Sequence, residues 1–131
     1  MPGERLSGSF AESYSAASDL STHQYKLVKL TSTGVDVCGA QSATEVPIGV
    51  LQNDPISGNA ACVMLQGLSS LKVNAASPNI AIGDMITSGA NGFGVKNTAD
   101  KAQVVGRAND AAAADGVIIS VLLFGASQAG V

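Results

Sequence analysis

At 131 residues the chain has the length of one domain, and 46% hydrophobic residues are enough to build a core. The net charge is −3, and the seven Lys and Arg residues are scattered along the chain, which argues against nucleic-acid binding. No run approaches the roughly 20 apolar residues of a membrane-spanning helix. The first residues also lack the apolar segment of a secretory signal, so we expect neither a membrane anchor nor a leader.

The composition favours small residues and few charges. The chain has 15 Gly and no Trp, and only 13% of its residues are charged, about half the usual share. This composition fits either an ordinary Ala/Gly-rich β domain or a chain that functions in an assembly, where neighbours cover a weakly charged surface. Cys38 and Cys62 are too few for a disulfide scaffold and lie in apolar runs. We expect them to be small core residues, with a cross-strand disulfide as the alternative.

Residues 1–24 differ from the rest of the chain because they are rich in Ser, Gly and Ala. Leu6, Phe10 and Tyr14 recur every four residues, the spacing of a helical stripe, but the serines and Gly8 disfavour a stable helix. We therefore predict an extended N-terminal arm whose three large apolar side chains dock onto a partner. The alternative is a frayed terminus.

From residue 25 the chain is a succession of short apolar runs separated by turn residues. Turn signals every eight to twelve residues, without a helical pattern between them, indicate an all-β domain over residues 25–131. Its architecture is predicted to be a small β-barrel or β-sandwich of the β-tulip kind. Only 111–114, four alanines, could form a helical turn. The predicted strands are 25–30, 35–38, 47–51, 60–65, 68–73, 81–87, 93–96, 102–108 and 116–124.

The clearest feature is a hairpin pattern that occurs twice. Residues 46–67 consist of two apolar runs joined by a polar turn, and residues 104–125 repeat the pattern. A shift of 58 residues also places Val28 on Ile86 and Val63 on Val121, so chance similarity is the weaker explanation.

The recurrence predicts a domain built from two similar halves, 25–67 and 82–125, that face each other and bury one core. Gly49 matches Gly106 at a shift of 57 rather than 58, so the alignment of the two halves slips by one residue between the first strand and Gly58 or Gly116. The matched glycines are expected to mark positive φ angles or close backbone approaches rather than a binding site. These glycines are Gly49, Gly58, Gly67, Gly106, Gly116 and Gly125.

The sequence offers few candidates for catalysis. The single histidine, His23, lies in a polar turn, where an exposed or capping role is expected rather than a metal or general-base role. Glycines 89, 92 and 94 precede Lys96 as in some phosphate loops, but a strand rather than a helix follows, which favours a hairpin. The aspartates do not have the spacing of a calcium loop. We therefore predict no catalytic residue, no metal site and no cofactor.

Several segments resemble the small head decoration, or cement, proteins of tailed bacteriophages, and the resemblance covers about residues 10–125. The residues that carry it are Asp19-Leu20-Ser21, Gln24-Tyr25, Val28-Lys29-Leu30, Pro47-Ile48-Gly49-Val50-Leu51-Gln52-Asn53, Gly58, Ala60-Ala61-Cys62-Val63, Ala81-Ile82-Gly83-Asp84, Gly116 and Ile119-Ser120-Val121-Leu122. The resemblance implies a β-rich structural virion protein, made in the host cytoplasm, that binds the major capsid protein on the outer surface of the head. It also implies capsid stabilisation, often as a homotrimer near three-fold positions, without enzyme activity.

Three hypotheses follow. The first is capsid decoration, with Leu6, Phe10 and Tyr14 as the capsid-contact arm. The second is a host-binding module on the capsid surface, either a carbohydrate-binding domain or a fibre. It is weakened because such sites usually present aromatic platforms, and the few aromatic residues are spread along the chain. The third, an enzyme, is disfavoured by the scarcity of catalytic residues.

Overall fold

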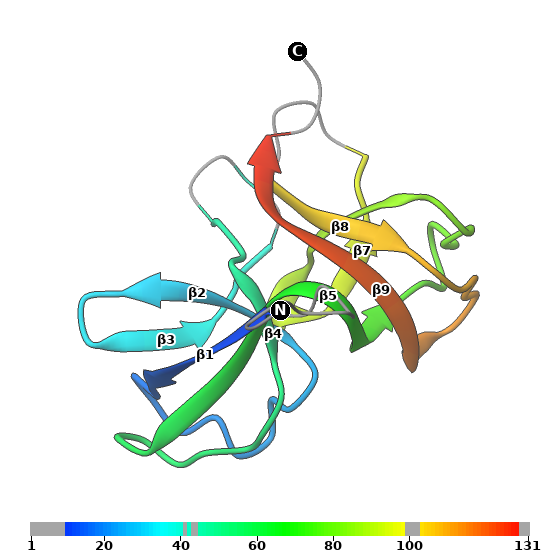
Figure 1. Ribbon diagram of the computed structural model, residues 1–131. Coiled ribbons are helices and arrows are strands. Elements are labelled where there is room, and N and C mark those ends of the chain that lie inside the picture. The colour runs from blue at the N-terminus through cyan, green and yellow to red at the C-terminus, as the bar shows by residue number, and fades with distance from the viewer. Residues whose placement is uncertain (1–9, 41, 43–44, 99–102, 129–131) are drawn as a thin grey trace, which may run out of the picture.

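The computed structural model describes residues 10–40, 42, 45–98 and 103–128. They form an all-β structure with one short 3-10 helix, η1 (Figure 1). The elements are β1 (Phe10–Ser15), β2 (Leu27–Thr31), β3 (Gly34–Val37), β4 (Gly49–Leu51), β5 (Ala60–Asn74), β6 (Met85–Ser88), η1 (Ala90–Gly92), β7 (Gly94–Lys96), β8 (Gln103–Ala108) and β9 (Asp115–Gln128).

The strands close into two small barrels that share β5. In the N-terminal barrel, antiparallel ladders join β1 to β5, β5 to β4, β4 to β2 and β2 to β3, and a parallel bridge between Ala16 and Val35 closes the ring. In the C-terminal barrel, β5 pairs with β9, β9 with β8, β8 with β6 and β6 with β7. A parallel pair between Val73 and Gly94 returns β7 to β5. The fold is therefore a barrel fold made of two similar halves, as predicted.

The 15-residue strand β5 runs through both barrels (Figure 1). The sequence predicted two strands here, 60–65 and 68–73, with a break at Gly67. Gly67 does take a positive φ of 107°, but the ladder continues through it to β9. The first part of β5 therefore belongs to the N-terminal barrel, and its second part belongs to the C-terminal barrel.

The two halves share strand pairs and a turn hydrogen bond at equivalent positions. Val28 pairs with Gly49 in the N-terminal barrel, and Ile86 pairs with Gly106 in the C-terminal barrel. The turn that precedes β5 is held by the backbone bond from Gln52 N to Cys62 O, 2.8 Å long. Its equivalent before β9, from Asn109 N to Ser120 O, has the same length. The turns of the hairpins 46–67 and 104–125 thus share this backbone bond.

The repeat is longer than the sequence predicted, because it includes β1. Strand β1 pairs antiparallel with the first part of β5, as the second part of β5 pairs with β9. Ala16 is buried and Leu20 is fully buried, so the described part of the predicted arm, residues 10–24, packs against the N-terminal barrel. Residues 1–9 lie outside the described residues.

The prediction of one core is wrong, because the buried side chains form two clusters. The N-terminal cluster consists of Ala16, Leu20, Val28, Val35, Leu51, Ala61 and Val63. The larger C-terminal cluster also takes in side chains of the first half, because the barrels meet there. It consists of Leu27, Cys38, Val50, Leu71, Val73, Ala75, Ile80, Ile86, Val105, Ala108, Ile119, Val121 and Leu123.

Equivalent glycines have equivalent constraints in the two halves. A Cβ atom on Gly49 would collide with the carbonyl oxygen of Met64, and one on Gly106 would collide with that of Leu122. Gly58 and Gly116 instead take positive φ angles of 85° and 80° in open space. Gly125, the sixth glycine singled out in the sequence, lies in β9.

Both cysteines are free thiols. Cys38 is buried in the C-terminal cluster, and its burial raises the pKa of the thiol. Cys62 is exposed on β5, contrary to the expectation that it is a core residue. In the part of the chain that the structure describes, no helix is long and apolar enough to cross a membrane.

Candidate interaction surface

Several exposed apolar side chains lie on the outer side of the β5–β9 ladder. Leu68, Ile118 and Leu122 are each about half exposed there, and Phe124 follows along β9. Leu68 and Leu122 are direct cross-strand partners. We call these four side chains the β5–β9 face. Figure 1 shows β9 crossing the outside of the C-terminal barrel.

The face arises from a strand that is apolar on both sides. Ile119, Val121 and Leu123 alternate with the exposed residues of β9 and point into the C-terminal cluster. Because successive side chains of a strand point to opposite faces, a continuous apolar run places apolar groups on the outer side too. Such a run is typical of strands that are covered on both sides.

Two cations flank the β5–β9 face. Arg107 pairs with Leu122 in the β8–β9 ladder, and its guanidinium donates to the carbonyl of Gly83 over 2.9 Å. Lys72 pairs with Ile118 in the β5–β9 ladder. The face thus carries four large apolar side chains, with the uncharged Ser70–Ser120 pair between them and a basic border. Apolar groups with a polar rim are common in protein interfaces.

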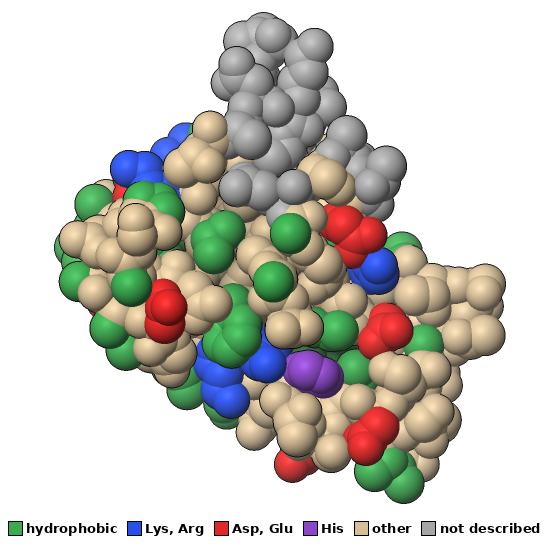
Figure 2. All heavy atoms as spheres, turned by 180° about the vertical axis from the view of Figure 1, so that it is seen from behind, with side chains coloured by type: hydrophobic (Ala, Val, Ile, Leu, Met, Phe, Trp, Pro, Cys, Tyr) green, Lys and Arg blue, Asp and Glu red, His purple; other side chains and the backbone are tan. Residues whose placement is uncertain are grey.

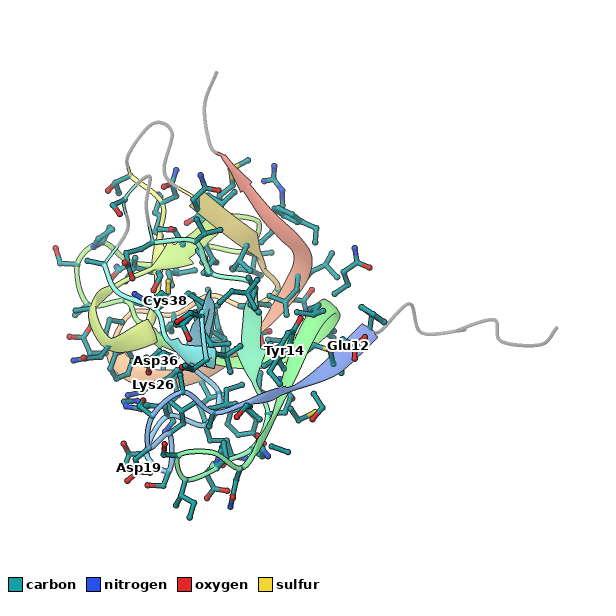
Figure 3. The ribbon with its side chains drawn as sticks, turned by 90° about the vertical axis from the view of Figure 1, so that its left-hand side faces the viewer. Glu12, Tyr14, Asp19, Lys26, Asp36 and Cys38 are labelled. Carbon is teal, nitrogen blue, oxygen red and sulfur yellow. The ribbon has the colours of Figure 1, made fainter. Side chains whose placement is uncertain are left out.

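The three predicted arm residues have different positions. Leu6 lies outside the described residues. Phe10 begins β1 as a half-buried residue in register with Gln66, two residues before Leu68. Tyr14 packs its ring against the N-terminal cluster, and Figure 3 shows it on β1 beyond Glu12. Phe10 therefore lies close to the β5–β9 face, whereas Tyr14 packs against the protein's own N-terminal cluster.

A second feature is a group of cations where the 20–26 segment meets β5. Lys26 is only 8% exposed, and its ammonium lies 3.2 Å from His23 Nδ1 and 4.3 Å from the centre of the Phe93 ring. Because an ammonium group can only donate, the Nδ1 atom accepts and the imidazole carries its proton on Nε2. The backbone N of Lys72 donates to the carbonyl of Tyr25 over 2.8 Å, which ties β5 to this segment.

Burial and neighbouring positive charges lower the pKa values of Lys26 and His23. Burial lowers the pKa of Lys26, and the Lys72 ammonium lowers it further. Burial, followed by the Lys26 charge, also lowers the pKa of His23. Figure 2 shows the histidine beside lysine or arginine side chains on the rear face of the molecule. His23 is therefore half-buried and hydrogen-bonded rather than simply exposed.

The polar residues considered for chemistry do not gather into a site. Among the described residues, no three His, Cys, Asp or Glu side chains lie close enough to hold a metal ion. Gly92 belongs to η1, and Gly94 begins β7 as part of a hairpin with β6. Asp110 accepts a bond from the Ser120 amide and Asp84 accepts one from the Ala81 amide, so both act in turns.

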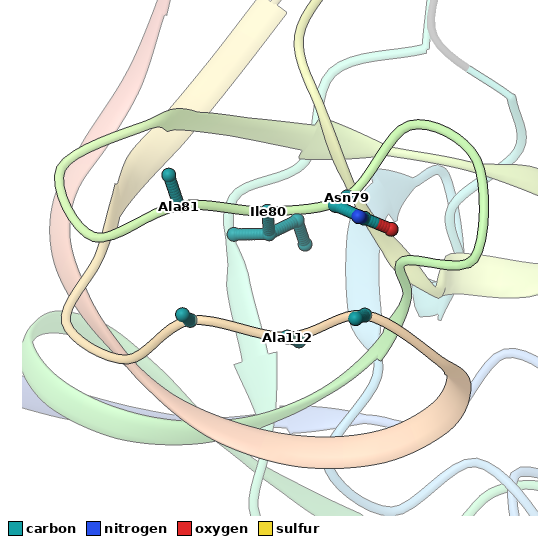
Figure 4. Close-up of a pocket in the computed structure, with 6 residues that line it drawn as sticks. Asn79, Ile80, Ala81 and Ala112 are labelled. Carbon is teal, nitrogen blue, oxygen red and sulfur yellow. The ribbon is translucent and has the colours of Figure 1, made fainter.

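A shallow apolar hollow of about 350 Å³ lies where the 79–81 segment faces the 111–113 segment (Figure 4). Ile80 and Ala112 exchange two backbone hydrogen bonds of 2.9 Å across it. Apart from Asn79, its lining consists of Ile and Ala, which offer no acid, base or nucleophile. The four alanines 111–114 thus form part of an irregular connection and not a helical turn.

Comparison with known families decides the assignment. The family model for phage cement proteins matches residues 14–123, which covers both barrels. The chain belongs to the phage cement protein family. As a cement protein it has a structural role in the phage capsid, and its place is in the virion.

A solved structure has a similar fold. The crystal structure of the N base of head fiber gp8.5 from bacteriophage phi29 superposes with a TM-score of 0.59 and 23% sequence identity. The alignment covers 88% of this cement-family chain and 94% of that chain. No curated protein matches the sequence.

Sequence reasoning missed both surface features. The run 116–124 was interpreted as a core strand, although its apolar residues on both sides indicated a second covered face. Lys26 gave no signal, because its burial depends on Phe93, 67 positions away in the chain.

Proposed function

We propose that this cement-family protein decorates the outer surface of a tailed-phage head, where it binds the major capsid protein and bridges neighbouring capsomers. The family match over residues 14–123 carries this proposal. The exposed apolar β5–β9 face and the low charge of the chain support it, because both suit a protein that is covered by neighbours.

The mechanism of stabilisation is mass action. A ligand that binds the assembled shell but not its separated subunits shifts the equilibrium toward the shell. A protein that touches two capsomers at once adds avidity, because the second contact becomes intramolecular. Phe10 at the start of β1 is assigned to the capsid contact, together with Leu6 and with the part of the half-buried Tyr14 side chain that the N-terminal cluster leaves uncovered.

We further assign the β5–β9 face to contacts between copies in a homotrimer. Its four large apolar side chains lie on adjacent antiparallel strands, and their exposure in a single copy disfavours the monomer in water. A second copy of the chain is the occupant that this composition fits, since the centre of the face carries no charge to match.

Mixing the purified protein with expanded heads that lack decoration tests the main proposal. Saturable binding and a higher temperature of head disruption are expected. Heads that neither bind the protein nor gain resistance to heat would contradict it. Phe10→Ala is expected to weaken binding without unfolding the domain, since Phe10 is a half-buried residue at the start of β1.

Leu122→Glu tests the trimer. A carboxylate in the centre of the β5–β9 face is expected to convert a trimer into a monomer, as measured by sedimentation equilibrium. Leu30→Glu is the matched control, because Leu30 is equally exposed but lies on β2 of the other barrel. A wild-type monomer, or a Leu122→Glu trimer, would overturn this assignment.

A further inference from the structure

In the part of the chain that the structure describes, Lys26 and Lys72 have no acidic partner. The described residues contain two ion pairs with an N–O distance within 4.0 Å, Lys29–Glu45 and Lys96–Asp84, and neither involves Lys26 or Lys72. An ammonium that is partly removed from water is commonly paired with a carboxylate, because desolvating a charge is costly. Lys26 has instead one neutral nitrogen acceptor and one aromatic ring.

The two carboxylates whose charge acts on His23 already accept hydrogen bonds elsewhere. Asp36 accepts from the Ser18 hydroxyl over 2.7 Å and from the Val37 amide over 2.8 Å. Asp19 accepts from the Ser21 amide over 3.0 Å. Both carboxylates act on His23 only through their charge, and neither forms an ion pair with Lys26 or Lys72. Figure 3 shows Asp19, Lys26 and Asp36.

The equivalent turn of the C-terminal barrel shows what is unusual here. The backbone bond from Lys26 N to His23 O, 3.1 Å long, has its counterpart in Asp84 N to Ala81 O, also 3.1 Å. In that turn the side chain in the Lys26 position is an aspartate, which satisfies the Ala81 amide within its own turn.

The residue before each of these two side chains has a positive φ. In the C-terminal barrel it is Gly83, at 91°, and in the N-terminal barrel it is Tyr25, at 65°. This region of backbone conformation is strained for a residue other than glycine. The N-terminal turn thus retains both a strained residue and an unpaired cation.

We propose that Lys26, Lys72 and His23 form a notch that binds a carboxylate, with the Phe93 ring against the Lys26 ammonium. Resting on the function proposed above, the carboxylate belongs to an Asp or Glu side chain of the capsid protein. The Lys26 ammonium supplies a charge-assisted hydrogen bond to the anion, and the positive charge of Lys72 on the adjoining strand adds attraction. The bound carboxylate also offsets the repulsion between the two lysines. The chain has a net charge of −3 and its basic residues are scattered, so it has no extended basic surface for a polyanion. A single acidic side chain is therefore the ligand that we favour.

Titration of the full-length protein with sodium acetate tests the notch itself. NMR signals of the His23 ring and of the Lys26 and Lys72 side chains are followed while chloride is exchanged for acetate at constant ionic strength. Saturable shifts confined to these residues, and absent in Lys72→Gln, are expected. Shifts that are spread over the surface, or that appear with inorganic phosphate but not with acetate, would overturn the proposal.

Binding to undecorated heads tests the partner. Lys72→Gln is compared with Lys96→Gln, which also removes one positive charge, from a lysine whose side chain is 41% exposed. About a tenfold loss of affinity is expected for Lys72→Gln alone, with a weaker dependence on salt. Equal affinities would overturn the capsid assignment. If the wild-type protein does not bind heads, the proposed function fails, whereas the acetate titration still decides whether the notch exists.

Discussion

The two barrels share their pattern of strand pairing but only some of their side-chain interactions. Val28–Gly49 and Ile86–Gly106 are equivalent pairs, and both glycines press against a carbonyl of the next strand. By contrast, the Lys29–Glu45 ion pair of 2.8 Å is replaced by a hydrogen bond from the Thr87 hydroxyl to the Gln103 carbonyl. The comparison shows that the fold is held by backbone bonds and close packing, while the side chains at equivalent positions are free to take different roles.

The largest expected effect comes from Gly49→Ala and Gly106→Ala. Each substitution drives a Cβ atom into a backbone carbonyl that cannot move without breaking the ladder, so each is expected to destabilise the protein by about 3 kcal/mol or more. Urea unfolding measures both variants. Equal losses would confirm that the two halves are energetically equivalent at this position.

Gly58→Ala and Gly116→Ala serve as controls for these substitutions. Both glycines have a positive φ, but a new Cβ would meet no atom within 4 Å. Only backbone strain is added, so a loss of about 1 kcal/mol is expected for each. If these variants lose as much as Gly49→Ala, the collision argument is wrong.

An intermediate effect is expected from the turns before β5 and β9. Asn53 Oδ1 accepts from the Cys62 amide over 3.0 Å, and Asp110 Oδ2 accepts from the Ser120 amide over 2.9 Å. Asn53→Ala and Asp110→Ala each leave an amide without this acceptor, at a cost of about 1 kcal/mol. Asp110→Asn should be nearly neutral, because an amide oxygen still accepts. Thermal unfolding of the three variants measures the differences.

The smallest effect concerns Glu45→Gln and depends on pH. The hydrogen bond from Lys29, then that from the Gly39 amide, lowers the pKa of Glu45. A carboxyl with a lowered pKa stabilises the fold above its unfolded pKa, and this contribution disappears as pH falls through the folded pKa, below about pH 4.

Hydrogen bonding to Glu45 likewise raises the pKa of Lys29, so its contribution is lost above about pH 10. Both side chains are partly exposed, and solvent screening limits the pair to about 0.5 kcal/mol at neutral pH. Urea midpoints of Glu45→Gln and wild type should therefore differ between about pH 5 and 9 and converge in acid. A constant difference down to pH 2 would contradict this.

Periodicity predicted the strands whose pattern is local. The runs that become β2, β3 and β8 alternate or end at turn residues, and the hairpin repeat identified the two halves. Strand β1 was missed because its sequence, Phe-Ala-Glu-Ser-Tyr-Ser, has few apolar residues and acquires its pairing from the edge of β5. Lys26 could not be identified either, since its burial arises where two segments distant in sequence meet.

The sequence did not show which side of β9 would be exposed. A run such as Val117–Phe124 specifies that both sides of the strand are apolar, but not which side lies in the protein's own core. Ile118 and Leu122 are as apolar as Ile119 and Val121. They are exposed because their side chains point to the outer side of the sheet, whereas those of Ile119 and Val121 point into the core. That direction is set by the pairing with β5 and β8, which is tertiary information.

The continuous strand β5 gives the molecule a mechanical property. A linker between two barrels would let them hinge under load, whereas a single strand that is hydrogen-bonded in both barrels carries tension straight from one to the other. Pulling along β5 would shear its ladders, so that many hydrogen bonds resist together instead of opening one by one. If the protein bridges capsomers as proposed, this strand would make it a stiff tie between them.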